Sequence, residues 1–229
     1  MHQVSETKEK PGEATRSANM QQRRARILEA AREVMAAKGF EGLSIRNLAK
    51  RAGVTTPTIY NLVGNKNELL AQLMEGVFER FEDVQQNAVL GDPLASVESL
   101  INEVADLLSQ KEAFFRAAFV ANDRLRLQRQ QPVSDGLARA VQLVVNICTR
   151  ANELGLLKGD IHAHTLADHI YNSYLFARQE WMHGSLDANG FRQQALMSAY
   201  VALTADASDE WRQVLIQKIA SLSEASRSV

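Results

Sequence analysis

The sequence predicts an all-α fold in which a small three-helix unit precedes a larger helical domain. Apolar residues recur at helical spacing along most of the 229 residues, and no segment shows the alternation expected of a strand. Only four prolines and twelve glycines interrupt these patterns. The content of 45% hydrophobic and 23% charged residues is ordinary for a globular protein with a buried core.

The N-terminus and the apolar content indicate where the protein is found. Residues 1–20 are polar and lack the apolar centre of a signal peptide, so we expect a flexible tail and no export. No apolar run approaches the ~18 residues that a membrane span requires, so no membrane partner is expected. The single cysteine, Cys148, leaves no internal disulfide framework and fits a reducing cytoplasm.

Charge is distributed unevenly along the chain, although the formal net charge is only −1. Residues 21–70 carry nine Lys and Arg against four Asp and Glu, whereas residues 71–229 carry fourteen against twenty. This division predicts a small anion-binding module, residues 21–70, on a larger acidic body, residues 71–229. Chance scatter of surface charge is the alternative that charge alone leaves open.

The first two predicted helices lie in the basic segment. One covers residues 21–38 and ends at Gly39, with Phe40 folding back onto it. Ser44 opens a short second helix, and Gly53 ends it because glycine reaches the positive φ of a tight turn. The apolar faces of the two helices carry Ile27, Leu28, Ala31, Val34 and Met35, then Ile45, Leu48, Ala49 and Ala52.

The third predicted helix begins at Thr55 or Thr56. Pro57 is tolerated in a first turn and disfavours α geometry at the residue before it, so we expect Thr56 to be the cap. This helix is short, and Asn65 can cap a longer one that starts at Lys66. The apolar face of the longer helix carries Leu69, Leu70, Leu73, Met74, Val77, Phe78 and Phe81.

Further helices are predicted in the larger domain, without a repeat of fixed period. Clusters of Gly, Asp and Pro mark the breaks between them. We expect these helices at roughly 93–109, 111–121, 133–155, 162–183, 189–205 and 209–223.

Three short helices with a glycine turn before the third form a helix-turn-helix arrangement, whose third helix can enter the major groove of a duplex. Threonines suit the start of such a helix, because short side chains let the backbone approach base edges. The hydroxyl of Tyr60 and the ammonium of Lys66 suit phosphate oxygens, and Lys66 lies near a helix N-terminus, which also favours anions. The sequence therefore predicts double-stranded DNA as a partner.

Residues 27–70 also resemble a known family. The segment "ILEAAREVMAAKGFEGLSIRNLAKRAGVTTPTIYNLVGNKNELL" is similar to the N-terminal DNA-binding domain of the TetR family of transcriptional regulators. The Lys-Gly-Phe stop, the Ala-Gly-Val turn, the Thr-Ile-Tyr core and the Asn-Lys-x-Glu-Leu-Leu entry stand where that family has them. The resemblance implies a ligand-responsive, dimeric repressor whose body, residues 71–229, binds the ligand and dimerises.

The resemblance implies a role for each matching residue of the DNA-binding domain. Ser44 would cap the second helix and touch a phosphate, and Arg46 would reach the major groove, where a bidentate contact to guanine suits its guanidinium. Asn61 replaces an aromatic residue of many relatives, so its role stays open. The implied DNA-binding residues are Ser44, Arg46, Thr55, Thr56, Pro57, Thr58, Tyr60, Asn61 and Lys66.

Plain structural roles remain open for several of these residues. Tyr60 could instead pack against the first helix, and Arg46 could be a solvated surface residue. Arg23, Arg24 and Arg26, at the start of the first helix, are candidates for an arm along the DNA backbone, although basic helix starts are also common on plain surfaces.

For the larger domain, the resemblance implies a dimer interface and an effector pocket. The helices at about 162–183 and 189–205 are the dimer candidates, through Leu166, Ile170, Tyr174, Leu196, Tyr200 and Leu203. A pocket for an unidentified small-molecule effector could be lined by Phe114, Phe115, Phe119, Tyr171 and Phe176. Apolar residues at helical spacing are also what a plain core requires.

Other kinds of site find little support. The segment "DIHAHTLADH" suggests a metal site through His162, His164, Asp168 and His169, but its spacing matches no strong zinc pattern, so no metal or other cofactor is expected. No Ser/His/Asp, paired-carboxylate or phosphate-loop arrangement supports an enzyme. We therefore predict a cytoplasmic, homodimeric repressor that an effector releases from a palindromic operator. The alternatives are a helical protein-interaction adaptor and a transcriptional activator of the same fold.

Overall fold

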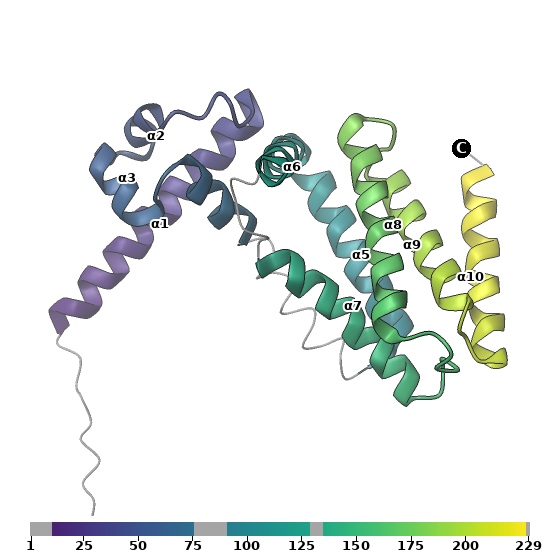
Figure 1. The fold of residues 1–229 in the computed structure, drawn as a ribbon. Helices are drawn as coiled ribbons and strands as arrows, with labels where there is room; N and C mark the ends of the chain where they lie inside the picture. The colour runs from purple at the N-terminus through teal and green to yellow at the C-terminus, as the bar shows by residue number, and fades with distance from the viewer. Residues whose placement is uncertain (1–10, 76–90, 129–134, 228–229) are drawn as a thin grey trace, which may run out of the picture. The chain divides into compact units, whose positions relative to one another are not determined.

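A computed structural model describes residues 11–75, 91–128 and 135–227, and Figure 1 shows its fold. The regular structure of these residues is α-helical, apart from an isolated bridge between Leu157 and Ala207, so the all-α prediction is confirmed. The chain divides into two compact units, Met1–Leu73 and Met74–Val229. Within the described ranges, no helix combines the length and the apolar character needed to cross a membrane.

The first unit packs three helices on one another and continues into a fourth. These are α1 (Pro11–Lys38), α2 (Ile45–Ala52) and α3 (Thr56–Val63), followed by a helix over residues 66–75. The predicted apolar faces form its core: Ile27, Ala31, Met35, Leu48, Ile59, Val63, Leu69, Leu70 and Leu73 are each at most 1% exposed. Val77, Phe78 and Phe81, predicted on the face of the last helix, lie outside the described residues.

Helix α1 begins ten residues before the predicted start at residue 21. Residues 16–26 are all exposed, so this part of the helix has no apolar stripe from which periodicity could locate it. Pro11 is the first helical residue, a position where its missing N–H group costs no hydrogen bond. Residues 11–20, assigned above to the tail, are therefore helical, and residues 1–10 lie outside the described part of the chain.

Two glycines permit the turns on either side of α3. Gly53 adopts φ 65° and ψ 39° between α2 and α3. At Gly64, with φ 80°, a Cβ atom would lie 2.0 Å from Oε2 of Glu68. Glu68 is held there because its Oε2 accepts the N–H of Asn65 at 2.7 Å, while Oδ1 of Asn65 accepts the N–H of Glu68 at 3.1 Å. This reciprocal capping box starts the helix over residues 66–75 directly after α3.

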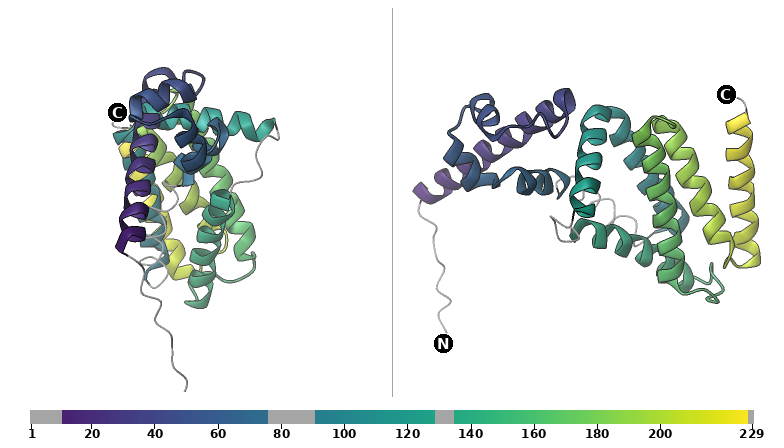
Figure 2. Two further views of the ribbon diagram at one scale, coloured as in Figure 1. Left: turned by 90° about the vertical axis from the view of Figure 1, so that its left-hand side faces the viewer. Right: turned by 45° about the horizontal axis from the view of Figure 1, so that its top comes forward.

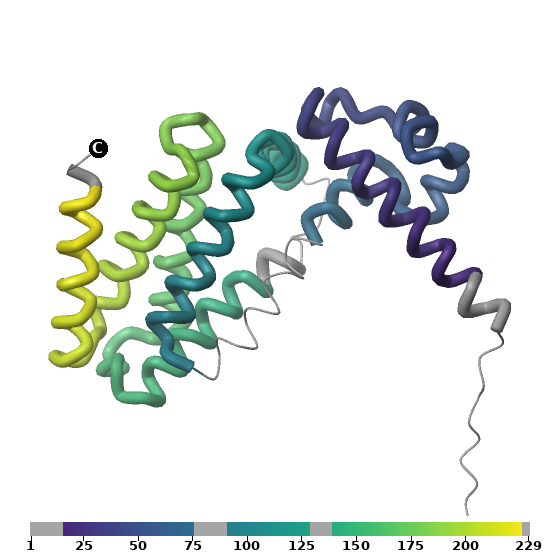
Figure 3. Tube along the Cα trace, turned by 180° about the vertical axis from the view of Figure 1, so that it is seen from behind, coloured from purple at the N-terminus to yellow at the C-terminus, as the bar shows by residue number. Residues whose placement is uncertain are grey.

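The second unit is a bundle in which α8 packs against α7 and α9, and α9 also contacts α5 and α10. Figure 2 shows α8 beside α9. Figure 3, the view from behind, shows α5 on the face of the bundle that is turned away from the viewer in Figure 1. The helix predicted at 111–121 continues to Leu127, because Leu125 extends its buried face. The bounds are α5 Pro93–Gln110, α6 Glu112–Leu127, α7 Asp135–Glu153, α8 Ala163–His183, α9 Ala188–Thr204 and α10 Asp209–Arg227.

Candidate nucleic-acid interface

Helix α3 has one buried side and one exposed side. Ile59 and Val63 anchor it in the core of the first unit. Tyr60 keeps 54% of its surface exposed, so most of this side chain is not packed in that core. The exposed side presents Thr55, Pro57, Tyr60 and Asn61, with Thr56 and Thr58 half-buried between them. Threonines, a proline and an asparagine thus form the surface expected to meet bases and phosphates, with the larger Tyr60 beside them.

The N-cap of α3 is Thr55 rather than the predicted Thr56. The Oγ1 atom of Thr55 accepts the backbone N–H of Thr58 at 3.3 Å, which is the bond that a cap makes to the third residue of a helix. Pro57 disfavours α geometry at Thr56, but this hydrogen bond outweighs that local preference, so the helix begins at Thr56 and Thr55 is its cap. The three residues after the cap are therefore already helical.

Two side chains on α2 lie exposed at or near its N-terminus. Ser44 is at the N-cap position with φ −114°, but its side chain makes no capping hydrogen bond, contrary to the predicted capping role. No Asp or Glu lies in the first turn of α2, so no carboxylate of that turn offsets the positive end of the helix. Arg46 forms no hydrogen bond or ion pair with a residue that the structure describes. Both side chains are thus available to an anion.

Lys66 lies against the loop that follows α1. Its Nζ atom is 4.3 Å from the centroid of the Phe40 ring and 3.8 Å from Oε2 of Glu41. The Glu41 side chain is 74% exposed, and exposed ion pairs contribute about 0–1 kcal/mol to stability. The ammonium can therefore exchange this carboxylate for a phosphate at little cost.

The arginines at the start of the basic segment differ in their contacts. Arg24 donates two hydrogen bonds to Oε1 of Gln72, from Nε at 3.1 Å and from Nη2 at 2.9 Å. Arg23 and Arg26 are exposed and form no hydrogen bond or ion pair within the described residues. Gln72 did not stand out in the sequence, because its partners are 48 and 9 residues away.

In the second unit, three of the five predicted pocket residues form one buried cluster. The rings of Phe114 and Phe115 lie 5.1 Å apart, and Phe115 and Phe119 lie 5.8 Å apart, between centroids. Trp181 of α8 meets Phe119 edge-on at 6.4 Å. Phe176 is 56% exposed and does not belong to this buried cluster, because it lies on the outward side of α8.

Beside this cluster, α8 carries polar groups. Arg178 donates from Nη2 to Oδ2 of Asp123 at 2.8 Å, and its guanidinium carbon lies 4.7 Å from the centroid of the Phe119 ring. The rings of Tyr171 and Tyr174 lie near this ion pair, tilted by 34° to each other with centroids 5.6 Å apart. Burial raises the pKa of both tyrosines, so both hydroxyls keep their protons to a higher pH than a solvent-exposed tyrosine does.

The residues predicted at the dimer interface are for the most part core residues of their own chain. Leu166, Ile170, Leu196, Tyr200 and Leu203 are each between 1% and 7% exposed, and Tyr174 is half-buried. Helical spacing located the apolar faces of α8 and α9, but other helices of the same chain cover these faces. Phe176 on α8 and Val201 on α9, with 56% and 55% exposure, are the large apolar residues that remain on the surface of these helices.

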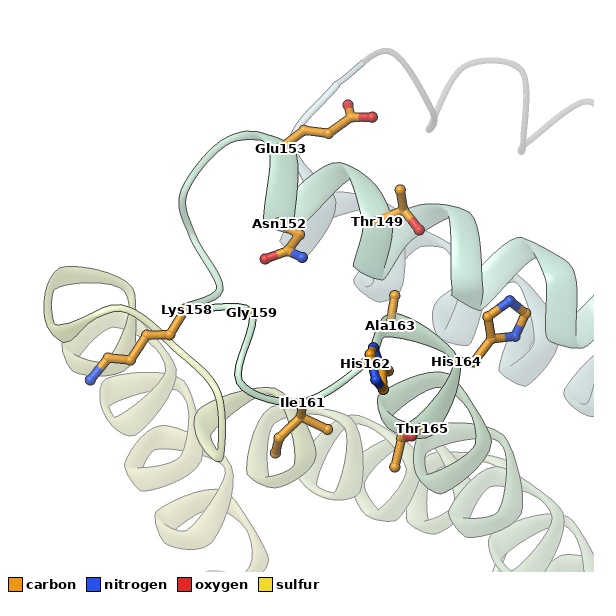
Figure 4. Close-up of a pocket in the computed structure, with 10 residues that line it drawn as sticks. All are labelled: Thr149, Asn152, Glu153, Lys158, Gly159, Ile161, His162, Ala163, His164 and Thr165. Atoms are coloured by element: carbon orange, nitrogen blue, oxygen red, sulfur yellow. The ribbon is translucent and has the colours of Figure 1, made fainter.

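The histidine segment forms the loop between α7 and α8 and the first turns of α8. It borders a pocket with Thr149 and Asn152, in which the rings of His162 and His164 point in different directions (Figure 4). Among the described residues, no three His, Cys, Asp or Glu side chains are grouped as metal ligands would be.

The loop beside this pocket is held by a residue that the sequence analysis missed. Oδ2 of Asp206, a residue only 1% exposed, accepts the N–H of Gly159 at 3.0 Å. Its Oδ1 accepts those of Asp160 at 3.0 Å and Ile161 at 3.3 Å. The segment thus has a structural partner 45 to 47 residues away, which no local pattern indicates.

Cys148 lies inside the second unit with no exposed surface. Burial raises the pKa of its thiol to about 12, so the reactive thiolate is absent at neutral pH.

Known proteins are similar to the first unit in sequence and to the chain in fold. Residues 27–73 match the family described as bacterial regulatory proteins, tetR family. The HTH-type transcriptional regulator PksA of Bacillus subtilis (strain 168) is 27% identical over 157 residues, which cover 66% of this chain and 74% of PksA.

Two solved structures share the fold at low identity. SmeT, the repressor of the Stenotrophomonas maltophilia multidrug efflux pump SmeDEF, has a TM-score of 0.67 at 20% identity, over 81% of this chain and 91% of SmeT. FadR of Bacillus subtilis, in complex with stearoyl-CoA, has a TM-score of 0.65 at 20% identity, over 78% of this chain and 97% of FadR.

Proposed function

We propose that this chain, a transcriptional regulator that belongs to the TetR family, is a dimeric repressor that a small molecule releases from its operator. The observation that carries the proposal is the exposed face of α3, which follows a glycine turn and presents Thr55 and Pro57 at its start, with Tyr60 and Asn61 behind them. A helix in this position can enter the major groove with its first residues against base edges.

The DNA contacts divide into base-reading and backbone-positioning groups. Arg46 reaches the groove from α2 and reads a guanine through two parallel hydrogen bonds, while Thr56, Pro57 and Thr58 contact base edges and thymine methyl groups. The backbone group holds phosphates and fixes the register of the protein on the duplex. It contains Ser44, Tyr60 and Lys66, whereas Thr55 belongs with the base-reading residues at the start of α3.

Two such units would act together across a two-fold axis. A homodimer places two α3 helices in successive major grooves of a near-palindromic operator. We assign the interface to the outer sides of α8 and α9, because Phe176 and Val201 leave apolar surface exposed there. The buried residues of the same helices support that surface from within.

The effector site is assigned to the region between α6 and α8. The aromatic cluster around Phe119 offers apolar contact area, and the Arg178–Asp123 pair with Tyr171 and Tyr174 offers polar groups beside it. FadR of Bacillus subtilis, which shares this fold, holds stearoyl-CoA. An effector that binds better to a conformation with the wrong separation of the two α3 helices weakens operator binding by that difference in affinity.

The proposal is tested by selecting binding sites for the full chain from random duplexes and measuring stoichiometry on the selected sequence. We expect a palindromic site with half-sites about one helical turn apart, bound by two chains. Compounds that raise the unfolding temperature are then tested for release of that duplex. Selection that enriches no sequence would contradict sequence-specific binding, and one chain per site would contradict the dimer.

A further inference from the structure

The amide of Gln72 joins three helices of the first unit at one point. Its Oε1 atom accepts both hydrogen bonds from Arg24 of α1, at 3.1 and 2.9 Å. Its Nε2 atom donates to the backbone oxygen of Val63 at 3.0 Å. Val63 is the last residue of α3, and Gln72 itself lies in the helix over residues 66–75.

The chemistry of these partners fixes the orientation of the amide. An arginine offers only donors, and a backbone carbonyl offers only an acceptor, so one of the two amide orientations satisfies both partners and the other satisfies neither. The carbonyl of Val63 is also one of the last four of α3, which have no partner inside the helix. Gln72 therefore supplies a hydrogen bond that the end of α3 requires.

The hydrogen bond from Gln72 to Val63 joins two residues that are only nine positions apart in the chain. Only Gly64 and Asn65 separate α3 from the next helix, and the capping box of Asn65 and Glu68 fixes the start of that helix. Gln72 lies two turns further on and returns to the end of α3. A displacement of the helix over residues 66–75 consequently acts on α3 at its C-terminus as well as through the chain.

We infer that Gln72 is a positioning residue for DNA recognition: it sets the position of α3 relative to α1 through its bonds to Val63 and Arg24. The inference rests on the proposed function, since it concerns how α3 is presented to an operator. It also separates Arg24 from its neighbours in the basic arm. Arg24 acts within the protein through Gln72, whereas Arg23 is left to contact phosphate.

The test compares Gln72→Met and Arg24→Ala with Arg23→Ala as the matched control. Gln72→Met keeps the length and neutrality of the side chain but removes both links. Arg24→Ala and Arg23→Ala remove the same charge from the same arm, yet only the first breaks the link. For each protein, the affinities for the selected operator and for a scrambled duplex are measured, together with the unfolding temperature.

Gln72→Met should lower operator affinity by about tenfold, the loss expected from a hydrogen bond or two, with scrambled-duplex affinity changed less than twofold. Arg24→Ala should reduce the ratio of the two affinities as well, whereas Arg23→Ala should lower both affinities equally. If wild type prefers the operator to the scrambled duplex and both Gln72→Met and Arg24→Ala keep the same ratio of the two affinities, this inference alone is overturned. A wild-type protein that prefers no sequence would overturn the proposed function and this inference with it.

Discussion

The hydroxyl oxygens of Thr55 and Thr58 lie 2.8 Å apart at the start of α3, and Thr55 also accepts the backbone N–H of Thr58. The first turn of α3 is therefore held by hydrogen bonds between its own residues. Thr55 is thus both a proposed DNA contact and a cap that stabilises the protein, and measurement has to separate these two roles.

Substitution of Thr55 tests the capping role. Thr55→Ala should lower the free energy of unfolding by about 1 kcal/mol, because the N–H of Thr58 loses its acceptor. Thr55→Ser retains the hydroxyl and should lose much less. Urea unfolding followed by circular dichroism measures both variants, and equal losses for Ala and Ser would contradict the capping role.

Asp206 should be among the most sensitive positions of the second unit. Asp206→Ala leaves the N–H groups of Gly159, Asp160 and Ile161 without their acceptor, which should cost about 2–3 kcal/mol. Asp206→Asn keeps one acceptor oxygen and should lie between Ala and wild type. Denaturant unfolding of the second unit gives both values, and an alanine variant as stable as wild type would refute the role assigned to this carboxylate.

Alkaline pH should destabilise the protein in part through Tyr200. Burial, followed by the hydrogen bond to Oε1 of Glu98 at 2.6 Å and the charge of that carboxylate, raises the pKa of Tyr200 in the folded state. The unfolded chain loses this proton near pH 10 while the folded chain retains it, so the stability contribution is complete below pH 10 and is lost as pH rises further.

Tyr200→Phe removes the titrating group and leaves Glu98 paired with Lys218 at 2.9 Å. The free energy of unfolding of this variant should fall less steeply above about pH 10 than that of wild type. The remaining slope should come from Cys148, Tyr171 and Tyr174, whose pKa values burial also raises. Identical slopes in the two proteins would show that Tyr200 is not protonated preferentially in the folded state.

The proposed dimer can be tested with a pair of matched valines. Val201 on α9 and Val120 on α6 are both 55% exposed, but only Val201 lies on the helices assigned to the interface. Val201→Arg should raise the dimer dissociation constant at least tenfold, because it places a charge in an apolar contact, while Val120→Arg should not. Analytical ultracentrifugation distinguishes the two results, and the reverse order would move the interface to α6.

Sequence periodicity predicted most of this fold because most of its helices have one apolar side. It could not locate the start of α1, since residues 16–26 contact no core. It also could not say what covers an apolar face. Leu166 and Leu203 were predicted at a dimer interface, but neighbouring helices of the same chain bury them.

The candidate site was predictable to the extent that its residues are close in sequence. The glycine turn, the threonines of α3 and Arg46 lie within 13 residues, and the resemblance to a known family covers them all. Gln72 and Asp206 depend on partners far along the chain, so only the folded structure indicates them. The cap at Thr55 rather than Thr56 was decided by one side-chain hydrogen bond.

The most direct test of the central claim is the affinity of wild type and Arg46→Ala for the selected operator and for a scrambled duplex, at two salt concentrations. Arg46→Ala should weaken operator binding by about 1–3 kcal/mol at both salt concentrations and scarcely change binding to the scrambled duplex. Wild-type binding should also fall steeply with salt, as phosphate contacts require. Equal affinities of both proteins for both duplexes would contradict the claim that this face of α2 and α3 reads DNA sequence.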